Sequence, residues 1–127
     1  MNAKKKYFMD CHLAGRMYHE ADEVWNMLKV GTKVELVREE DNRYDPQAVM
    51  VCYNNEENDE QVCLGYIPRE QNNTIALLMD MGYSDIFECR INQINEKAHP
   101  EQQVHLTIKI RRRNEEETTN KTTRKRK

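Results

Sequence analysis

The sequence predicts a mainly β fold, in which about six short strands form a small barrel and one or two short α-helices interrupt them. Six apolar segments alternate between apolar and polar residues or are rich in β-branched residues, as half-buried strands are. The helical segments do not alternate with these strands, which excludes a doubly wound parallel sheet. A chain of 127 residues with 38% hydrophobic residues has room for one modest core. Small closed or partly open barrels of this kind occur in OB-like folds.

The first predicted strand covers residues 7–13 (YFMDCHL), and Gly15 permits a bend or bulge after it. A short helix is predicted over residues 21–28, because two acids suit a helix N-terminus and the apolar residues that follow have helical spacing. Gly31 is expected to end this helix.

Residues 33–39 and 48–53 are predicted to be the two strands of a hairpin. The intervening segment, EEDNRYDP, is dense in turn-forming residues and is long for a simple hairpin loop. After a hydrophilic turn at residues 54–60, residues 61–67 resume strand character until Pro68 stops the strand.

The strongest helical pattern lies in the second half of the chain, where helical spacing is shown by Thr74, Ile75, Leu77, Leu78 and Met81. Asn72 or Asn73 is expected to cap the start of this helix, and Gly82 to follow its end as the C′ residue. Residues 86–94 and 104–110 then alternate and predict a closing hairpin.

Charge divides the chain into a predicted domain at residues 1–110 and a basic tail at residues 111–127. The tail holds eight Lys and Arg and three Glu, a formal charge of +5, which leaves −7 for the remainder. It contains no apolar residue, so we expect it to be disordered. Such an arm suits nonspecific contact with nucleic acid phosphates, but also a solubilising role or contact with the acidic body.

The four cysteines, Cys11, Cys52, Cys63 and Cys89, lie in separate apolar segments and form no Cys-x-x-Cys pair. This spacing argues against a zinc site and favours buried, reduced core thiols. The basic start MNAKKK is not followed by the apolar region of a signal peptide, and no apolar stretch is long enough for a membrane span. We therefore expect a soluble cytoplasmic protein that does not contact membranes and needs no metal or other cofactor.

Three short patterns recur in a recognisable order along the chain. They are Ala14-Gly15-x-x-Tyr18, then Asp41-Asn42-x-Tyr44-Asp45-x-x-Ala48-Val49-x-Val51, and finally Leu64-Gly65-Tyr66-Ile67-Pro68-Arg69-Glu70. Together they resemble the HIRAN domain family, over residues 7–94. The resemblance implies a modified OB-like barrel that captures the 3′-hydroxyl end of single-stranded DNA, with no catalysis of its own and with a role in DNA repair.

The resemblance also implies roles for individual residues. Tyr18 matches an aromatic that stacks on a terminal base, Tyr44 and Asp45 match the loop that meets the 3′-hydroxyl, and Arg69 matches a basic position facing a phosphate. His19 stands where end-binding members often have a second aromatic, and Met17 where they often have a basic residue. The predicted DNA-binding residues are Tyr18, His19, Tyr44, Asp45, Tyr66 and Arg69.

Elementary chemistry supports these roles. An aromatic ring stacks on any base, which contributes on the order of 1–3 kcal/mol without strong sequence preference. The carboxylate of Asp45 can accept a hydrogen bond from a free hydroxyl but repels a phosphate. Arg69 would supply the compensating charge for the penultimate phosphate.

Simpler interpretations stay open for the same residues. Tyr44 is equally compatible with core or turn packing, Asp45 with capping the turn at Pro46, and Arg69 with a solvated side chain. Trp25, the sole tryptophan, is expected in the core rather than in a ligand site.

Two other functions are compatible with the sequence. One is a protein-interaction or regulatory barrel that does not bind DNA ends. The other is a metal-dependent phosphoester hydrolase built on the loop carboxylates Glu39, Glu40, Asp41 and Asp45. The chain has only four glycines and no phosphate-binding loop of the Gly-x-x-x-x-Gly-Lys-Ser/Thr type, which excludes an ATP-driven motor. Work at a replication fork would therefore require a separate helicase or translocase as partner.

Overall fold

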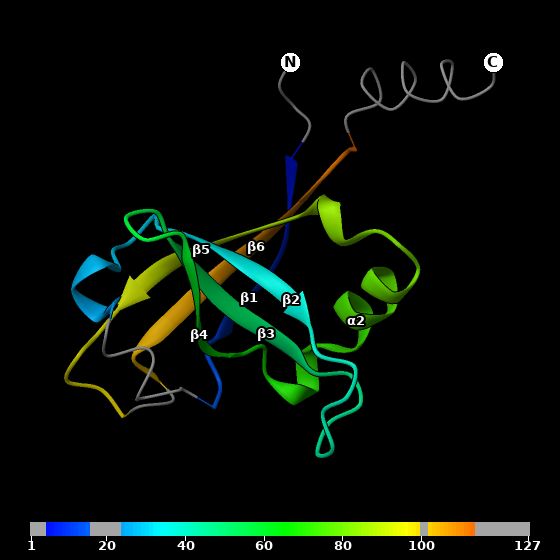
Figure 1. Cartoon of the computed structure of the whole chain (residues 1–127), viewed down its shortest axis with the longest axis horizontal. Helices are drawn as coiled ribbons and strands as arrows, with labels where there is room; N and C mark the ends of the chain where they lie inside the picture. The colour runs from blue at the N-terminus through cyan, green and yellow to red at the C-terminus, as the bar shows by residue number, and fades with distance from the viewer. Residues whose placement is uncertain (1–4, 16–23, 100–101, 114–127) are drawn as a thin grey trace.

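Six antiparallel strands form one sheet in the computed structural model, which describes residues 5–15, 24–99 and 102–113 (Figure 1). Their order across the sheet is β1-β6-β5-β2-β3-β4. The strands are β1 (Lys5–His12), β2 (Lys33–Arg38), β3 (Val49–Asn55), β4 (Glu60–Tyr66), β5 (Phe87–Ile94) and β6 (Val104–Arg111). The prediction of a mainly β fold with six strands is confirmed.

Four helical segments are present in the described residues: α2 (Asn73–Asp80) and the 3-10 turns η1 (Trp25–Met27), η2 (Arg69–Gln71) and η3 (Ser84–Ile86). The predicted late helix is confirmed as α2. Gly82 follows its last turn with a φ of +96°, a conformation that favours glycine. The predicted early helix at 21–28 coincides with η1 at its end, and its first residues lie outside the described part of the chain.

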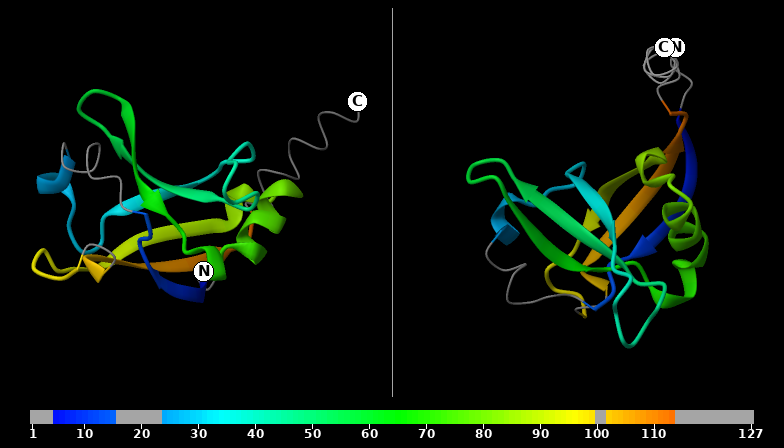
Figure 2. Two further views of the ribbon diagram at one scale, coloured as in Figure 1. Left: turned by 90° about the horizontal axis from the view of Figure 1, so that it is seen from below. Right: turned by 45° about the vertical axis from the view of Figure 1, so that its right-hand side comes forward.

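The sheet is strongly bent but does not close into the predicted barrel. Strands β2 and β5 pair over only Lys33↔Arg90 and Val34↔Cys89, and then separate (Figure 2). The two edges of the sheet meet in the described residues at one bridge, where the Ala14 and Tyr66 amides donate to each other's carbonyl oxygens at 2.8 and 2.7 Å. Closure fails because the edge strands share one bridge rather than a ladder.

The core lies between the two halves of the bent sheet. Alternate residues of the strands fill it, and α2, at one end of the sheet, adds Ile75, Ala76 and Met79. Trp25 is partly buried against this core, in agreement with its predicted role. No helix of the described residues has the length and apolarity to cross a membrane.

The cysteines confirm most of the prediction made for them. Cys11, Cys52 and Cys89 are buried, and Cys63 is partly exposed. No disulfide joins these four residues, all of which the structure describes. Burial raises the pKa of Cys11 to about 12, so this thiol stays protonated and behaves as a small apolar group.

Candidate nucleic-acid interface

The three sequence patterns converge at the bridge between the edge strands. The first pattern supplies Ala14 and the third supplies Tyr66, which exchange both backbone hydrogen bonds. Gly65 permits this approach, because a Cβ at that position would lie 2.6 Å from the Ala14 carbonyl oxygen. In the sequence Gly65 was only one member of the third pattern, and the structure shows that a larger residue would clash at this position.

Tyr66 connects this bridge to the middle pattern. Its hydroxyl donates a hydrogen bond of 2.8 Å to Oε1 of Glu39, at the end of β2. The amide of Asn42 donates to the same oxygen, also at 2.8 Å. Burial and the bond to Glu39 raise the pKa of Tyr66 to about 12. The tyrosine therefore stays protonated and acts as a structural donor beneath the loop.

Residues 40–48, the β2–β3 loop, are shaped by the side chain of Asn42. Its Oδ1 accepts hydrogen bonds from the backbone amides of Tyr44 at 2.8 Å and of Asp45 at 2.9 Å. This asparagine-centred turn leaves the Tyr44 side chain 84% exposed. The alternative of a core-packed Tyr44 is therefore wrong, and the ring is available to a ligand.

Asp45 is held by hydrogen bonds to both of its carboxylate oxygens. Oδ1 accepts from the Gln47 amide at 3.0 Å, and Oδ2 accepts from the Asn72 side-chain amide at 2.8 Å. The side chain is still 20% exposed, and each oxygen keeps a second lone pair. The interpretation of Asp45 as a turn-capping residue is confirmed, yet this capped carboxylate retains the capacity to accept another donor.

Arg69 lies beside this carboxylate on η2. Its Nε is 4.0 Å from Asp45 Oδ2, and its side chain is 67% exposed. At this distance and exposure the ion pair contributes little to stability. The guanidinium is thus placed next to Asp45 but remains largely open to solvent.

Asn72 was predicted to cap the helix, but in the structure its side chain has a different role. It stands directly before α2, as predicted for an N-cap, but its side chain makes no capping hydrogen bond. It is fully buried and donates to Asp45 instead, while its own Oδ1 has no hydrogen-bond partner in the described structure. An asparagine before an apolar helix gives no signal in the sequence that separates these two roles.

Arg38 supports the loop from the other side. Its guanidinium donates to both carboxylate oxygens of Asp80 on α2, at 2.9 and 3.2 Å. It also donates to the carbonyl oxygens of Ala48 at 3.0 Å and Pro46 at 2.7 Å. One planar group thus joins the end of β2, the β2–β3 loop and the helix.

The structure therefore places Arg69 next to Asp45 and exposes the ring of the adjacent residue, Tyr44. Tyr66 is connected to the same loop through Glu39 and Asn42. The remaining two predicted binding residues, Tyr18 and His19, lie outside the described residues. In sequence they follow Gly15 closely, and Gly15 adjoins the bridge.

The loop carboxylates do not gather into a metal site. Among the described residues, no three His, Cys, Asp or Glu side chains are grouped so that they could hold a metal ion. Glu39 and Asp45 are instead bound by the neutral donors of Asn42, Tyr66 and Asn72. The ligand set on which the hydrolase hypothesis depends is thus missing from the described part of the chain.

A model of the HIRAN domain matches residues 6–112, which is most of the chain. The chain belongs to the HIRAN domain family. A curated relative, the Fanconi-associated nuclease 1 homolog of Oryza sativa subsp. japonica, is 33% identical over 104 residues, which are 81% of this chain and 10% of the relative. This HIRAN domain protein therefore spans about a tenth of the length of that nuclease homolog.

Two solved structures resemble this HIRAN fold. A crystal structure of a protein from Lactobacillus plantarum has a TM-score of 0.68 and 26% identity, and covers 84% of this chain and 94% of the other. The crystal structure of the HIRAN domain of human HLTF has a TM-score of 0.52 and 18% identity, and covers 98% of this chain and 94% of the other. The second likeness is one of fold.

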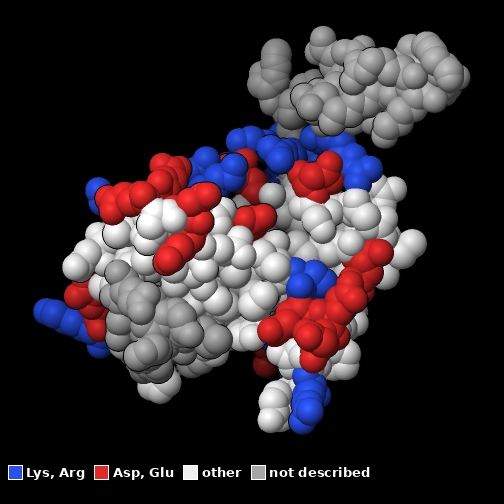
Figure 3. Space-filling view, in the orientation of Figure 1, with Lys and Arg blue, Asp and Glu red and all other residues white. Residues whose placement is uncertain are grey.

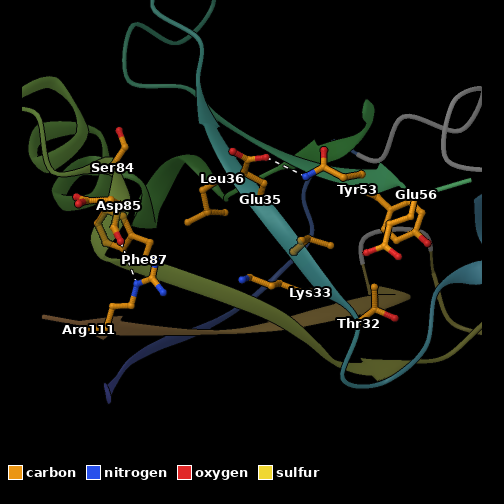
Figure 4. A pocket seen from close by; sticks show the side chains of 12 residues that line it. Thr32, Lys33, Glu35, Leu36, Tyr53, Glu56, Ser84, Asp85, Phe87 and Arg111 are labelled. Atoms are coloured by element: carbon orange, nitrogen blue, oxygen red, sulfur yellow. Dashed lines mark hydrogen bonds between the residues drawn. The ribbon is translucent and has the colours of Figure 1, made fainter. Parts of the chain in front are cut away.

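The HIRAN domain also contains a groove of about 550 Å³ where β2 and β5 separate (Figure 4). Its lining mixes the cations Lys33 and Arg111 with the acids Glu35, Glu56 and Asp85. None of the four predicted DNA-binding residues that the structure describes lines it. The hollow follows from the short β2–β5 pairing and is separate from the surface around Asp45.

Proposed function

We propose that this HIRAN domain binds the 3′-hydroxyl end of single-stranded DNA and has no catalytic activity of its own. A nucleic-acid-binding role in general agrees with the family to which the chain belongs. The single observation that supports the finer proposal is the state of Asp45. Its carboxylate is fixed by two neutral donors, is partly exposed and keeps free lone pairs, and the ring of the adjacent residue, Tyr44, is exposed.

Charge explains how such a site would select an end. A carboxylate accepts a hydrogen bond from a free hydroxyl, and a charge-assisted bond of this kind is roughly twice as strong as a neutral one. A terminal phosphate in the same place would carry negative charge against Asp45, with exposed Glu40 and Asp41 in the same loop. Figure 3 shows acidic side chains gathered on the part of the surface that carries the β2–β3 loop and α2. The site would thus reject phosphorylated ends.

Tyr44 and Arg69 would complete the recognition. The exposed ring of Tyr44 offers a stacking surface for a terminal base, which suits binding without sequence preference. The solvent-exposed guanidinium of Arg69 would contact a backbone phosphate, because it is only loosely paired with Asp45. A partner helicase or translocase would supply any motor activity.

The test is a binding titration with two single-stranded oligonucleotides that differ only in a 3′-hydroxyl or a 3′-phosphate. We expect tighter binding to the hydroxyl end, and loss of this preference in Asp45→Asn, which keeps the side-chain shape but removes the charge. Asp41→Asn, an exposed acid of the same loop, is the matched control and should retain the preference. Equal affinity of the natural protein for both ends would refute end recognition. A folded protein that binds neither strand would favour the alternative function, a protein-interaction or regulatory domain.

A further inference from the structure

Two basic segments from opposite ends of the chain lie together at one end of the sheet. Strands β1 and β6 are antiparallel partners, with Lys5 opposite Arg111 and Tyr7 opposite Lys109. We call this surface the basic end; it consists of Lys5, Lys6, Lys109, Arg111, Arg112 and Arg113, all exposed. Figure 3 shows Lys and Arg side chains in a band along this edge of the molecule, in a chain whose formal net charge is −2.

Half of the basic end is already engaged within the protein. Lys5 pairs with Glu88 at 2.6 Å, and Arg111 donates to the carbonyl oxygen of Asp85 at 3.1 Å. Arg113 pairs with Asp85 at 3.0 Å and lies over the ring of Tyr83. These contacts fix the start of β1 to β5 and the end of β6 to the segment that precedes β5.

The other half, Lys6, Lys109 and Arg112, makes no ion pair with any residue that the structure describes. Tyr7 is 63% exposed and projects to the same face as its partner Lys109, whereas Lys6, the preceding residue of β1, projects to the opposite face. Uncommitted cations carried on paired strands are held at fixed spacings, which lowers the entropic cost of binding an anionic chain.

We propose that the basic end is a second nucleic-acid contact, which binds the sugar–phosphate backbone irrespective of how the strand ends. The cations would displace counterions from phosphates along the edge formed by β1 and the end of β6, and Tyr7 would stack on a base beside Lys109. The exposed aromatic beside Lys109 favours nucleic acid over an acidic peptide, because it offers a stacking surface that a base would use and a peptide carboxylate would not.

The basic end and the surface around Asp45 lie at opposite ends of the molecule, where the views show the start of β1 beside the end of β6, and the β2–β3 loop, respectively (Figures 1 and 2). The two contacts are therefore separate in space and opposite in charge. A strand held by its backbone at the basic end need not present a 3′-hydroxyl at all, so this inference stands or falls independently of end recognition.

A circular single-stranded DNA, which has no ends, isolates the backbone contact. The test variant of the full chain replaces Lys6, Lys109 and Arg112 with Gln. The control variant replaces Lys29, Lys33 and Lys97 with Gln, which removes the same charge from exposed positions elsewhere. Binding to the circle is measured over a series of salt concentrations, and thermal unfolding of each variant confirms that it folds.

We expect the test variant to bind the circle more weakly and the slope of log K against log salt to fall by about 2, since each single-strand phosphate contact contributes roughly 0.7. The control should keep the natural slope. A charge-conserving variant with Lys6→Arg, Lys109→Arg and Arg112→Lys should bind like the natural protein. Throughout, the ratio of affinities for 3′-hydroxyl and 3′-phosphate strands should not change, because Asp45 is untouched.

Three results would overturn the proposal. The natural protein could fail to bind the circle at low salt, or the test and control variants could give equal slopes. In a parallel measurement with anionic lipid vesicles, the test variant could lose affinity for the vesicles but not for the circle. The last would assign the basic end to a membrane surface. Absence of any 3′-end preference, with the slope change intact, would refute the proposed function and leave the backbone contact standing.

Discussion

The side-chain amide of Asn72 donates a hydrogen bond of 2.8 Å to the carboxylate of Asp45, across 27 positions of sequence. Asn72 is fully buried and Asp45 is partly exposed, so the bond fixes a carboxylate at the surface of the loop to a side chain in the core. A fixed acceptor loses less entropy when a ligand binds than a mobile one does. Under the proposed function, we expect this pair to determine how well Asp45 discriminates between strand ends.

Asn72→Ala should weaken the preference for 3′-hydroxyl over 3′-phosphate ends. The substitution removes one of two donors to Asp45 and should lower the free energy of unfolding by about 1–2 kcal/mol. Fluorescence anisotropy with both oligonucleotides measures the preference, and urea unfolding measures the stability. The neighbouring Asn73→Ala, an exposed residue that accepts from Gln47, is the control. An unchanged preference in a folded Asn72→Ala protein would show that Asp45 orients without this bond.

Tyr44→Ala should weaken binding to single strands by roughly 5- to 150-fold, because stacking on one base contributes about 1–3 kcal/mol. Stability should barely change, since the ring is 84% exposed and removes little apolar area from water. Tyr44→Phe keeps the stacking face and should bind like the natural protein. A titration with one oligonucleotide compares the three proteins. Equal affinity of Tyr44→Ala and the natural protein would exclude stacking at this position.

Gly65→Ala should impair both folding stability and DNA binding. The new methyl group would lie 2.6 Å from the Ala14 carbonyl oxygen and 3.0 Å from Leu13, so the bridge must open at a cost of about 1–3 kcal/mol. Gly31→Ala is a useful comparison, because a Cβ there meets no atom within 4 Å but its φ of +98° disfavours alanine. Both variants should unfold at lower temperature, whereas only Gly65→Ala should lose end binding. Equal DNA affinity of the two variants would show that DNA binding does not depend on the bridge between Ala14 and Tyr66.

The carboxylate of Glu88 should make stability depend on acid pH. Hydrogen bonds from Lys5 and Arg90 lower its pKa from 4.5 to about 2. The group therefore stabilises the fold fully above pH 4.5, and this contribution is lost as the pH falls toward 2. Both cations are about half exposed, so the contribution is on the order of 1 kcal/mol.

Glu88→Gln tests this expectation by urea unfolding over a pH series. The natural protein should be the more stable at neutral pH, and the difference should shrink between pH 4.5 and 2. Glu40→Gln, at an exposed carboxylate, should follow the natural protein. A constant difference at every pH would mean that Glu88 acts through packing and not through its charge.

Local pattern was sufficient to predict most of the elements. The alternation at residues 104–110 became β6, with Val104, Leu106 and Ile108 buried, because a period of two places every second side chain in the core. The late helix and Gly82 followed from helical spacing and backbone conformation in the same way. These features depend on neighbours in sequence, which a single chain displays directly.

Features that depend on distant pairing could not be predicted. The open sheet results from the two-residue contact between β2 and β5 and from the single bridge between Ala14 and Tyr66. Strand alternation carries no information about the length of such ladders. The Asn72–Asp45 bond was missed for the same reason, because it joins residues 27 positions apart.

The pairing of the first strand with the last has a consequence for protein architecture. Because Lys5 lies opposite Arg111, the polypeptide enters and leaves the fold at one point. A domain whose first and last strands lie side by side can be inserted into a surface loop of another protein, because the two ends of that loop are close together. Insertion of the domain into another protein would therefore leave its own strand pairing unchanged.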